Sequence, residues 1–282
     1  SNGKLVCSPT ASAIALDEFP DDGLLFRTVP SDSLQARAIA EAVNQTGAER
    51  VAIAYIDDPY GRPFSDAVEV ALADEGLTAV ERIAFSSTAD DLSEQAATIA
   101  NSDARVAVVL ANSEDATRLI EALDDQDSAD LATIVVNDAL RNPAAPQRLQ
   151  NIDPDLRARI VGVAPQADSG DAAAPFDPPG LFAANAYDCA NLIALAAVRA
   201  SSDAPADMAT HIAEVSVSGS VCTTYAECLA TIDSGLQIDY NGPSGVTDLS
   251  TRTGDPSRAI FDRFVFNDAG RDELQRQIVV VG

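Results

Sequence analysis

The sequence predicts an α/β protein in which a parallel β-sheet is covered on both faces by helices. Short segments that are apolar almost throughout, as buried parallel strands are, recur along the chain. Amphipathic segments of about 10 to 15 residues separate them, which is the length of a crossover helix. The composition is that of a globular protein, with 282 residues of which 46% are hydrophobic.

The first half of the chain alternates between these two kinds of segment. Strands are expected at residues 5–7, 50–56, 78–85, 105–110 and 133–136. Helices are expected from residue 31 to about 45, from 64 to about 75, from about 90, and from 113. Ligands bind at the carboxyl ends of the strands in such sheets, so the loops after Cys7, Ile56, Leu110 and Val136 are the candidate binding loops.

The second half has a different pattern. Residues 168–179 are rich in Asp, Ala and Pro and lack periodicity, which is typical of a crossing segment or surface loop. Residues 180–200 form a long apolar helix, whose uncharged part is too short to span a membrane. Helices around residue 211 and from 225 to 232, a turn at 239–245 and an alternating strand at 260–266 complete the prediction.

Charge and histidine content exclude several classes of function. Forty-four acidic residues against eighteen basic ones give a net charge of −26, which disfavours nucleic acid and anionic lipid as partners. The single histidine, His211, rules out a multi-histidine zinc site and leaves one residue for any Ser-His-Asp triad. The acidic run at 124–130 lacks the Gly and terminal Glu of an EF-hand, so we expect a solvated turn. A binding protein without metal or cofactor is favoured over an enzyme.

Four motifs stand in an order that carries a family resemblance. They are Phe-Arg-Thr-Val-Pro-Ser-Asp at 26–32, Asp-Pro-Tyr-Gly-Arg at 58–62, Cys-Thr-Thr-Tyr-Ala-Glu-Cys at 222–228 and Ile-Asp-Tyr-Asn-Gly-Pro-Ser-Gly at 238–245. Together they resemble the type I periplasmic binding proteins, specifically the branched-chain amino-acid (Leu/Ile/Val) substrate-binding component of ABC transporters. The resemblance covers essentially the whole chain. It implies two α/β lobes, joined by three crossings, that close on a small solute in the cleft between them.

The resemblance also predicts the lobes and their surroundings. The first lobe would comprise residues 1–27 and 178–258, and the second residues 28–177 and 259–282. Family members carry about a hundred residues, roughly three βα units, ahead of the strand at 5–7. We therefore expect an incomplete first lobe with an exposed sheet edge, which leaves room for a homodimer. We expect an extracytoplasmic protein, periplasmic or a cell-surface lipoprotein, whose native signal lies outside this sequence.

Five ligand-binding residues follow from the resemblance, residue by residue. Thr10 and Ser12 match the loop that holds the amino-acid head group, although a turn without ligand would give the same pattern. Tyr60 matches an aromatic wall, or else packs in a surface turn. Asp138 matches the acid that pairs with the ligand's α-ammonium, or else caps a helix. Asn112 stands where close homologues carry an aromatic residue, which favours a more polar or different solute.

The four cysteines suggest disulfides, because the family is exported from the cytoplasm. Cys222 and Cys228 are close enough in sequence to pair across a loop that enters a helix. Cys7 and Cys189 both map to the first lobe and form the second candidate pair, with buried free thiols as the alternative.

The function that the resemblance implies is that of a solute-binding protein of an ABC importer, with the ABC permease as its partner and an amino acid or similar small polar solute as its ligand. The alternatives are a ligand-sensing receptor domain on the same fold and a truncated paralogue that does not bind ligand.

Overall fold

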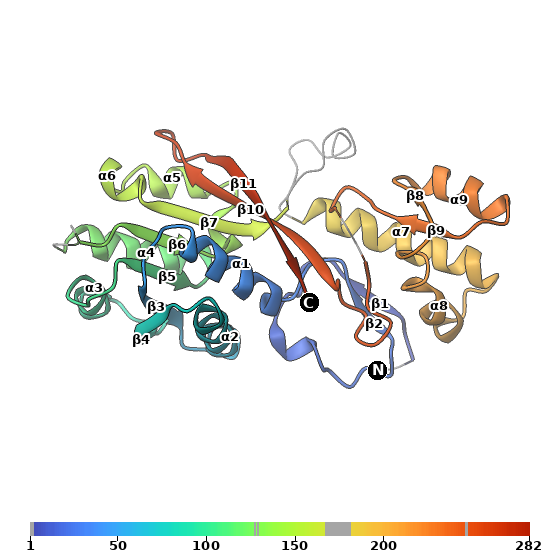
Figure 1. The fold of residues 1–282 in the computed structure, drawn as a ribbon, viewed down its shortest axis with the longest axis horizontal. Coiled ribbons are helices and arrows are strands. Elements are labelled where there is room, and N and C mark those ends of the chain that lie inside the picture. Colours follow the sequence, from blue (N-terminus) through green and yellow to red (C-terminus); the bar gives the residue numbers. More distant parts are fainter. Residues whose placement is uncertain (1–2, 127, 129, 167–181, 246–247) are drawn as a thin grey trace. The chain divides into compact units, whose positions relative to one another are not determined.

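The computed structural model describes residues 3–126, 128, 130–166, 182–245 and 248–282 (Figure 1). The chain divides into two compact units, the first made of Ser1–Leu34, Pro165–Ile260 and Val279–Gly282 and the second of Gln35–Ala164 and Phe261–Ile278. The chain therefore passes between the units four times, one more than the resemblance implies, because its last residues return to the first unit. Each unit is described separately below.

The second unit is built on a seven-stranded sheet with the strand order β11-β10-β7-β6-β5-β3-β4 (Figure 1). Its strands are β3 (Arg50–Ile56), β4 (Thr78–Phe85), β5 (Val106–Leu110), β6 (Thr133–Val136), β7 (Ile160–Pro165), β10 (Arg258–Phe266) and β11 (Asp272–Val281). Its helices are α1 (Asp32–Asn44), α2 (Gly61–Asp74), α3 (Ser93–Ala100), α4 (Ser113–Asp124), α5 (Ala145–Leu149) and α6 (Pro154–Arg157), with the short 3-10 turn η2 (Asp138–Leu140). The strands from β4 to β7 pair in parallel, as the sequence predicts.

The central strands of this sheet are buried on both faces. Ala52 and Ala54 of β3 belong to a core that also contains Leu119 and Ile120 of α4. Side chains of alternate residues on a strand point to opposite faces of the sheet. Val51 and Ile53 of β3 and Val106 and Val108 of β5, which point to the other face, are also fully buried. A strand that is buried on both faces has a nearly continuous apolar sequence. This pattern predicted the central strands.

Several predicted boundaries in the second unit differ from the structure by a few residues, and several of its elements were not predicted. Helix α2 begins at Gly61 rather than Phe64, because the carboxylate of Asp58 accepts hydrogen bonds from the N–H groups of Tyr60 and Gly61 and Pro63 fits in a first turn. The strands β7 and β11 and the short helices α5 and α6 were not predicted. The expected loop at 168–179 and positions 127 and 129 of the acidic run lie outside the described residues.

The missing prediction of β7 has a packing cause. Gly162 interrupts its apolar run, yet a side chain at this position would overlap the ring of Phe264 in the neighbouring strand β10. The glycine is thus required by the ring that lies across it, so the strand carries a residue of low strand propensity.

The described residues of the first unit form two small parallel sheets and three α-helices. The sheets are β1 (Val6–Ser8) with β2 (Leu25–Arg27) and β8 (Ser220–Cys222) with β9 (Ile238–Tyr240). The helices are α7 (Ala183–Ala200), α8 (Pro205–Ile212) and α9 (Tyr225–Asp233), and a 3-10 turn η1 covers Ile14–Leu16. Leu192 and Leu195 of α7 pack with Ile212 and Ile238 in one apolar cluster, so α7 is the core helix that the sequence predicts. Among the described residues, no helix is long and apolar enough to cross a membrane.

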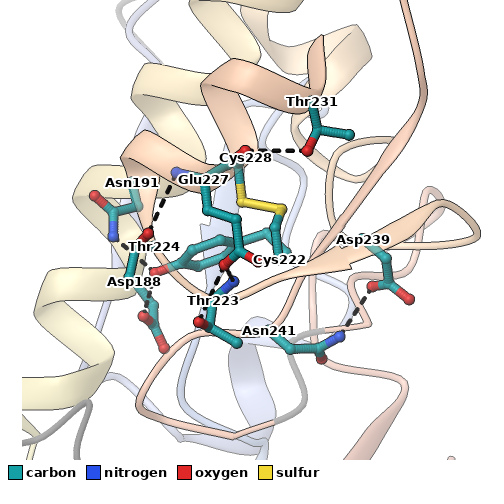
Figure 2. The surroundings of a disulfide bond; sticks show 11 residues. Asp188, Asn191, Cys222, Thr223, Thr224, Glu227, Cys228, Thr231, Asp239 and Asn241 are labelled. Atoms are coloured by element: carbon teal, nitrogen blue, oxygen red, sulfur yellow. Dashed lines mark hydrogen bonds between the residues drawn. A yellow bond between two sulfur atoms is a disulfide. The ribbon is translucent and has the colours of Figure 1, made fainter. Parts of the chain in front are cut away.

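Both predicted disulfides are present in the first unit. Cys7–Cys189 joins β1 to α7. Cys222–Cys228 joins the end of β8 to α9 (Figure 2). The second bond lies beside a helix cap, because the hydroxyl of Thr224 accepts from the N–H of Glu227 and the Glu227 carboxylate accepts from the N–H of Thr223 at 2.9 Å.

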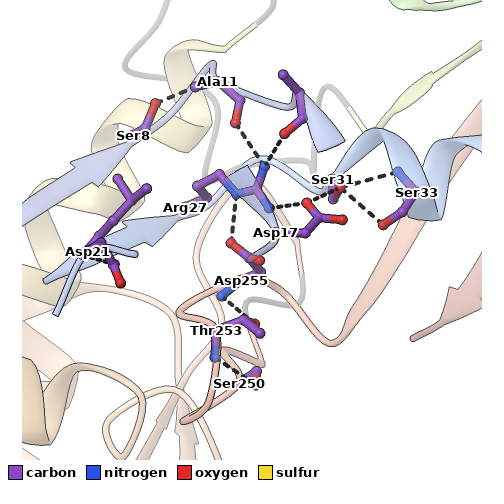
Figure 3. A network of polar contacts seen from close by, with 12 residues as sticks. Ser8, Ala11, Asp17, Asp21, Arg27, Ser31, Ser33, Ser250, Thr253 and Asp255 are labelled. Atoms are coloured by element: carbon purple, nitrogen blue, oxygen red, sulfur yellow. Dashed lines mark hydrogen bonds and ion pairs between the residues drawn. The ribbon is translucent and has the colours of Figure 1, made fainter. Parts of the chain in front are cut away.

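A buried arginine connects the loop segments of the first unit (Figure 3). Arg27 is 0% exposed and forms ion pairs with Asp17 at 2.7 Å and Asp255 at 2.6 Å. It also donates to the carbonyl groups of Ala11 and Ala13. Because a buried charge is costly unless it is paired and hydrogen-bonded, these four partners fix the path of the chain around β2.

A second buried cluster surrounds Asp188 of α7 (Figure 2). The Tyr240 hydroxyl donates to its carboxylate at 2.7 Å, and the N–H and hydroxyl of Ser244 donate to the other oxygen. Asn191 in turn donates to the Tyr240 hydroxyl at 2.7 Å. Burial raises the pKa of Asp188 to about 6, against the lowering effect of the hydrogen bonds from Ser244 and Tyr240.

Loss of the two disulfides should have unequal effects on stability. The pairs are separated by 182 and by 6 residues in the sequence. Since a cross-link restricts the unfolded chain more when it closes a longer loop, Cys7→Ser with Cys189→Ser should lower the free energy of unfolding by about 5 kcal/mol, and Cys222→Ser with Cys228→Ser by about 2 kcal/mol. Urea unfolding of both double variants measures this difference, and equal losses would contradict it.

Asp188 should make the first unit less stable as the pH rises. Its folded pKa lies above the unfolded value, so between about pH 4 and pH 6 the folded state binds more protons than the unfolded state. Asp188 should therefore contribute a fall of about 3 kcal/mol to the free energy of unfolding across this window. Asp188→Asn should remove this contribution, whereas the exposed control Asp74→Asn should keep it. Parallel pH profiles in wild type and Asp188→Asn would refute the assignment.

Candidate ligand-binding site

A cavity of about 250 Å³ opens in the second unit at the carboxyl ends of β3, β5 and β6. Three of the four loops singled out in the sequence contribute to it. Its lining residues are Ile56, Asp58, Tyr60, Ala111, Asn112, Asn137, Asp138 and Ala139. The structure thus brings together Tyr60, Asn112 and Asp138 in one cavity.

Asp138 is the first residue of η2 and is separated from the end of β6 only by Asn137. Its Oδ1 accepts a hydrogen bond from Nε2 of Gln35 at 3.0 Å. Burial raises the pKa of Asp138, while the hydrogen bonds from Gln35 and from its own backbone lower it. Among the described residues that line the cavity, none is basic, so the charge of Asp138 has no cationic neighbour there.

Tyr60 and Asn137 form the neighbouring part of the wall. The ring of Tyr60 contacts Phe64 of α2 edge to face, with 5.8 Å between the ring centroids. Nδ2 of Asn137 lies 3.4 Å from the Tyr60 hydroxyl, and Asn137 is buried. The sequence analysis did not select Asn137, although a polar residue at the carboxyl end of a buried strand is a recognisable signal.

Asn112 and Asp58 are largely occupied by helix capping. Oδ1 of Asn112 accepts from the N–H groups of Glu114 and Asp115, both at 3.0 Å, and its Nδ2 donates to the Asp115 carboxylate at 2.6 Å. Three of the hydrogen bonds that an asparagine amide can form are therefore made within the first turn of α4. A role of Asn112 in ligand specificity stays a prediction.

Thr10 and Ser12 lie in the first unit, between β1 and η1. Thr10 is exposed, and the carbonyl of Ser12 accepts from the N–H of Asp32 at 2.9 Å. The turn itself is formed by Ser8, whose hydroxyl accepts from the N–H of Ala11 at 3.1 Å. Their predicted contact with the ligand head group stays a prediction.

Gln35, like Asn137, was not among the site residues predicted from the sequence. It is 2% exposed, on the side of α1 that also carries the buried residues Ala38, Ile39 and Ala42. A polar side chain at helical spacing on an apolar face was the available signal, because a buried amide needs partners.

The comparisons with known proteins concern the family and the fold. Residues 3–240 match the family described as the receptor family ligand binding region. The chain belongs to this family. No curated protein matches the chain.

Solved structures define the fold more closely as that of type I solute-binding proteins. A solute-binding protein from R. palustris in complex with benzoate has a TM-score of 0.73 at 14% identity, covering 100% of this chain and 72% of its own. A leucine-binding protein from Thermotoga maritima has a TM-score of 0.71 at 16% identity, covering 97% of this chain and 73% of its own. The protein LivJ from Streptococcus pneumoniae in complex with isoleucine has a TM-score of 0.69 at 17% identity, covering 99% and 73%.

Proposed function

We propose that this protein is a non-enzymatic solute-binding protein of an ABC importer and that its ligand is an amino acid or a similar small polar solute. The observation that carries the proposal is the carboxylate of Asp138 in a cavity at the carboxyl ends of three parallel strands. The family and the structural neighbours support the class of function, since both consist of ligand-binding proteins.

The chemistry of the cavity favours a ligand with a protonated amine. Asp138 provides negative charge, Tyr60 provides an aromatic wall, and the described lining residues include no arginine or lysine to bind an anionic group. A plain aromatic carboxylate such as benzoate, which the R. palustris protein binds, would meet repulsion on this wall. The α-ammonium of an amino acid is the complementary group.

We also propose an extracytoplasmic location and an ABC permease as the protein partner. All four cysteines are paired in two disulfides. Such bonds persist in oxidising compartments rather than in the cytoplasm. The structural neighbours include a periplasmic binding protein of type 1 from Bordetella pertussis, with a TM-score of 0.68 and 15% identity.

A homodimer through the first unit is a further part of the proposal. Within the described residues, β1 pairs with β2 alone, and Val6 of β1 is 48% exposed. An open parallel edge with an apolar side chain favours pairing with a second strand. Light scattering should then give twice the monomer mass of 29.3 kDa, and Val6→Lys should restore the monomer. A monomeric wild type at high concentration would exclude the dimer.

The test of the ligand class is the affinity of Asp138 variants. Asp138→Ala would leave the ligand's ammonium without its partner and should cost about 2–5 kcal/mol, which is roughly thirty-fold to several-thousand-fold in the dissociation constant. Asp138→Asn keeps the shape and should cost less. Titration calorimetry of wild type with a panel of amino acids, with benzoate as the comparison ligand, comes first.

The matched control is Asp74→Ala, an exposed acid at the end of α2, which should bind like wild type. Melting of each ligand-free variant separates lost binding from lost folding. If Asp138→Ala melts normally and binds amino acids as tightly as wild type, the ammonium assignment is wrong. If no amino acid binds the wild type, a paralogue that does not bind amino acids becomes the better description.

A further inference from the structure

The amide group of Gln35 connects two parts of the second unit. Its Nε2 donates to Oδ1 of Asp138 at 3.0 Å and to the carbonyl oxygen of Val163 at 2.8 Å. An amide nitrogen carries two hydrogens, so both bonds form at once. Turning the amide over would place its oxygen against a carboxylate and a carbonyl, which both repel it, so the orientation is fixed.

The position of Gln35 in the chain adds to this connection. Gln35 is the first residue of the second unit after the chain enters it at residue 35. Val163 lies one residue before Ala164, where the chain leaves it again. One buried side chain therefore holds the acid of the cavity and two ends of the unit's backbone together.

The choice of glutamine rather than a basic residue matters for the charge of the cavity. An arginine or lysine at this place would pair with Asp138 and cancel its charge, whereas a neutral amide stabilises the carboxylate and leaves its negative charge for a ligand. Gln35 binds Oδ1, and the other hydrogen bond to this carboxylate comes from the backbone of Asp138 itself, so among the described residues no second side chain donates to it.

We propose that Gln35 is a positioning residue that holds Asp138 ionised and directed toward the cationic group of the ligand. This inference rests on the proposed function for the ligand, but the part that concerns Asp138 itself is measurable without a ligand. Nothing in the sequence motifs assigned a role to Gln35.

The charged groups around Asp138 do not offer another explanation of its behaviour. Asp58 lines the same cavity, but its carboxylate caps α2 through the N–H groups of Tyr60 and Gly61. Arg141, which follows η2, is paired with Asp262 and Asp272.

The remaining described elements around Asp138 add no charged group close to it. Tyr60 is the other titratable group of the cavity, and Arg37 of α1 is exposed. On β7, the residues from Ile160 to Pro165 carry no charge. Gln35 is the only side chain among the causes that lower the pKa of Asp138.

The experiment compares Gln35→Met and Gln35→Lys with wild type in the full chain. Methionine keeps the length of the side chain and removes both donors, so the pKa of Asp138 should rise. Lysine donates to the carboxylate but adds a positive charge, so the pKa of Asp138 should fall. Titration of ¹³C-labelled aspartate carboxyl groups reports this pKa in the ligand-free protein, and Asp138→Asn identifies the signal by its absence.

Both variants should bind an amino acid more weakly, for different reasons. Gln35→Met should lose about tenfold or more in affinity at neutral pH, with a larger loss toward acidic pH, because Asp138 is then protonated at a higher pH. Gln35→Lys should lose affinity at every pH, because its ammonium occupies the carboxylate. A merely structural role of Gln35 would lower affinity without moving the pH profile.

The control is Gln45→Met. Gln45 follows the same helix and donates to the carboxylate of Glu41 at 2.7 Å, but in an exposed position. Its replacement should change neither the pKa of Asp138 nor the affinity for the amino acid.

An unchanged Asp138 signal in both Gln35 variants overturns the inference whether or not a ligand is known. Shifted signals of Asp138 combined with no binding of amino acids by wild type would support the role of Gln35 toward Asp138 and reject the proposed ligand instead. If Gln35→Met does not fold, Gln35→Lys alone decides: unchanged affinity overturns the inference.

Discussion

Burial of the central sheet on both faces is the constraint on which the rest of the second unit depends. Every position of the central strand from Val106 to Leu110 is buried, so this strand has no place for polar ligand chemistry on either face. Along such a strand, polar side chains can reach solvent only where the strand ends. Because the carboxyl ends of β3, β5 and β6 lie at one edge, the residues that follow them form a single cavity. The location of the candidate site is thus a consequence of strand direction, and its chemistry depends on a few side chains at strand ends.

The same rule explains how much of the fold the sequence could predict. The strands β3, β4 and β6 were predicted with their observed bounds, because a short apolar run between two helical patterns is typical of a strand in a parallel sheet. The strand β7 was missed because Gly162, which the Phe264 ring requires, breaks the run. The strand β11 was missed because its apolar run, Ile278–Val281, comes only at its end, after a stretch from Asp272 to Gln277 in which Leu274 is the only apolar residue. For β7, the deciding information lies in the neighbouring strand.

The acid Asp138 and the aromatic residue Tyr60 could be predicted from the sequence as site residues. The hydrogen bond from Gln35 that supports Asp138 could not. Asp138 and Tyr60 follow strands, so their position in the sequence indicates where they lie. Gln35 contributes from a helix about a hundred positions earlier, and only the folded sheet brings its amide to the carboxylate. Asn112 shows the opposite case, since its position after β5 suggests a ligand contact while its hydrogen bonds within α4 account for most of its polar atoms. Position after a strand therefore selects candidates, and hydrogen bonding separates binding residues from caps.

The disulfide Cys7–Cys189 divides the sheet of the second unit along the chain. Residues 35–164, the main part of the second unit, lie between these two cysteines in the sequence. The covalent ring that the bond closes therefore contains the strands β3 to β7, whereas β10 and β11 of the same sheet follow Cys189 and lie outside the ring. A proteolytic cut inside the ring would leave the two pieces joined through sulfur, so a nicked molecule would keep its mass until the bond is reduced.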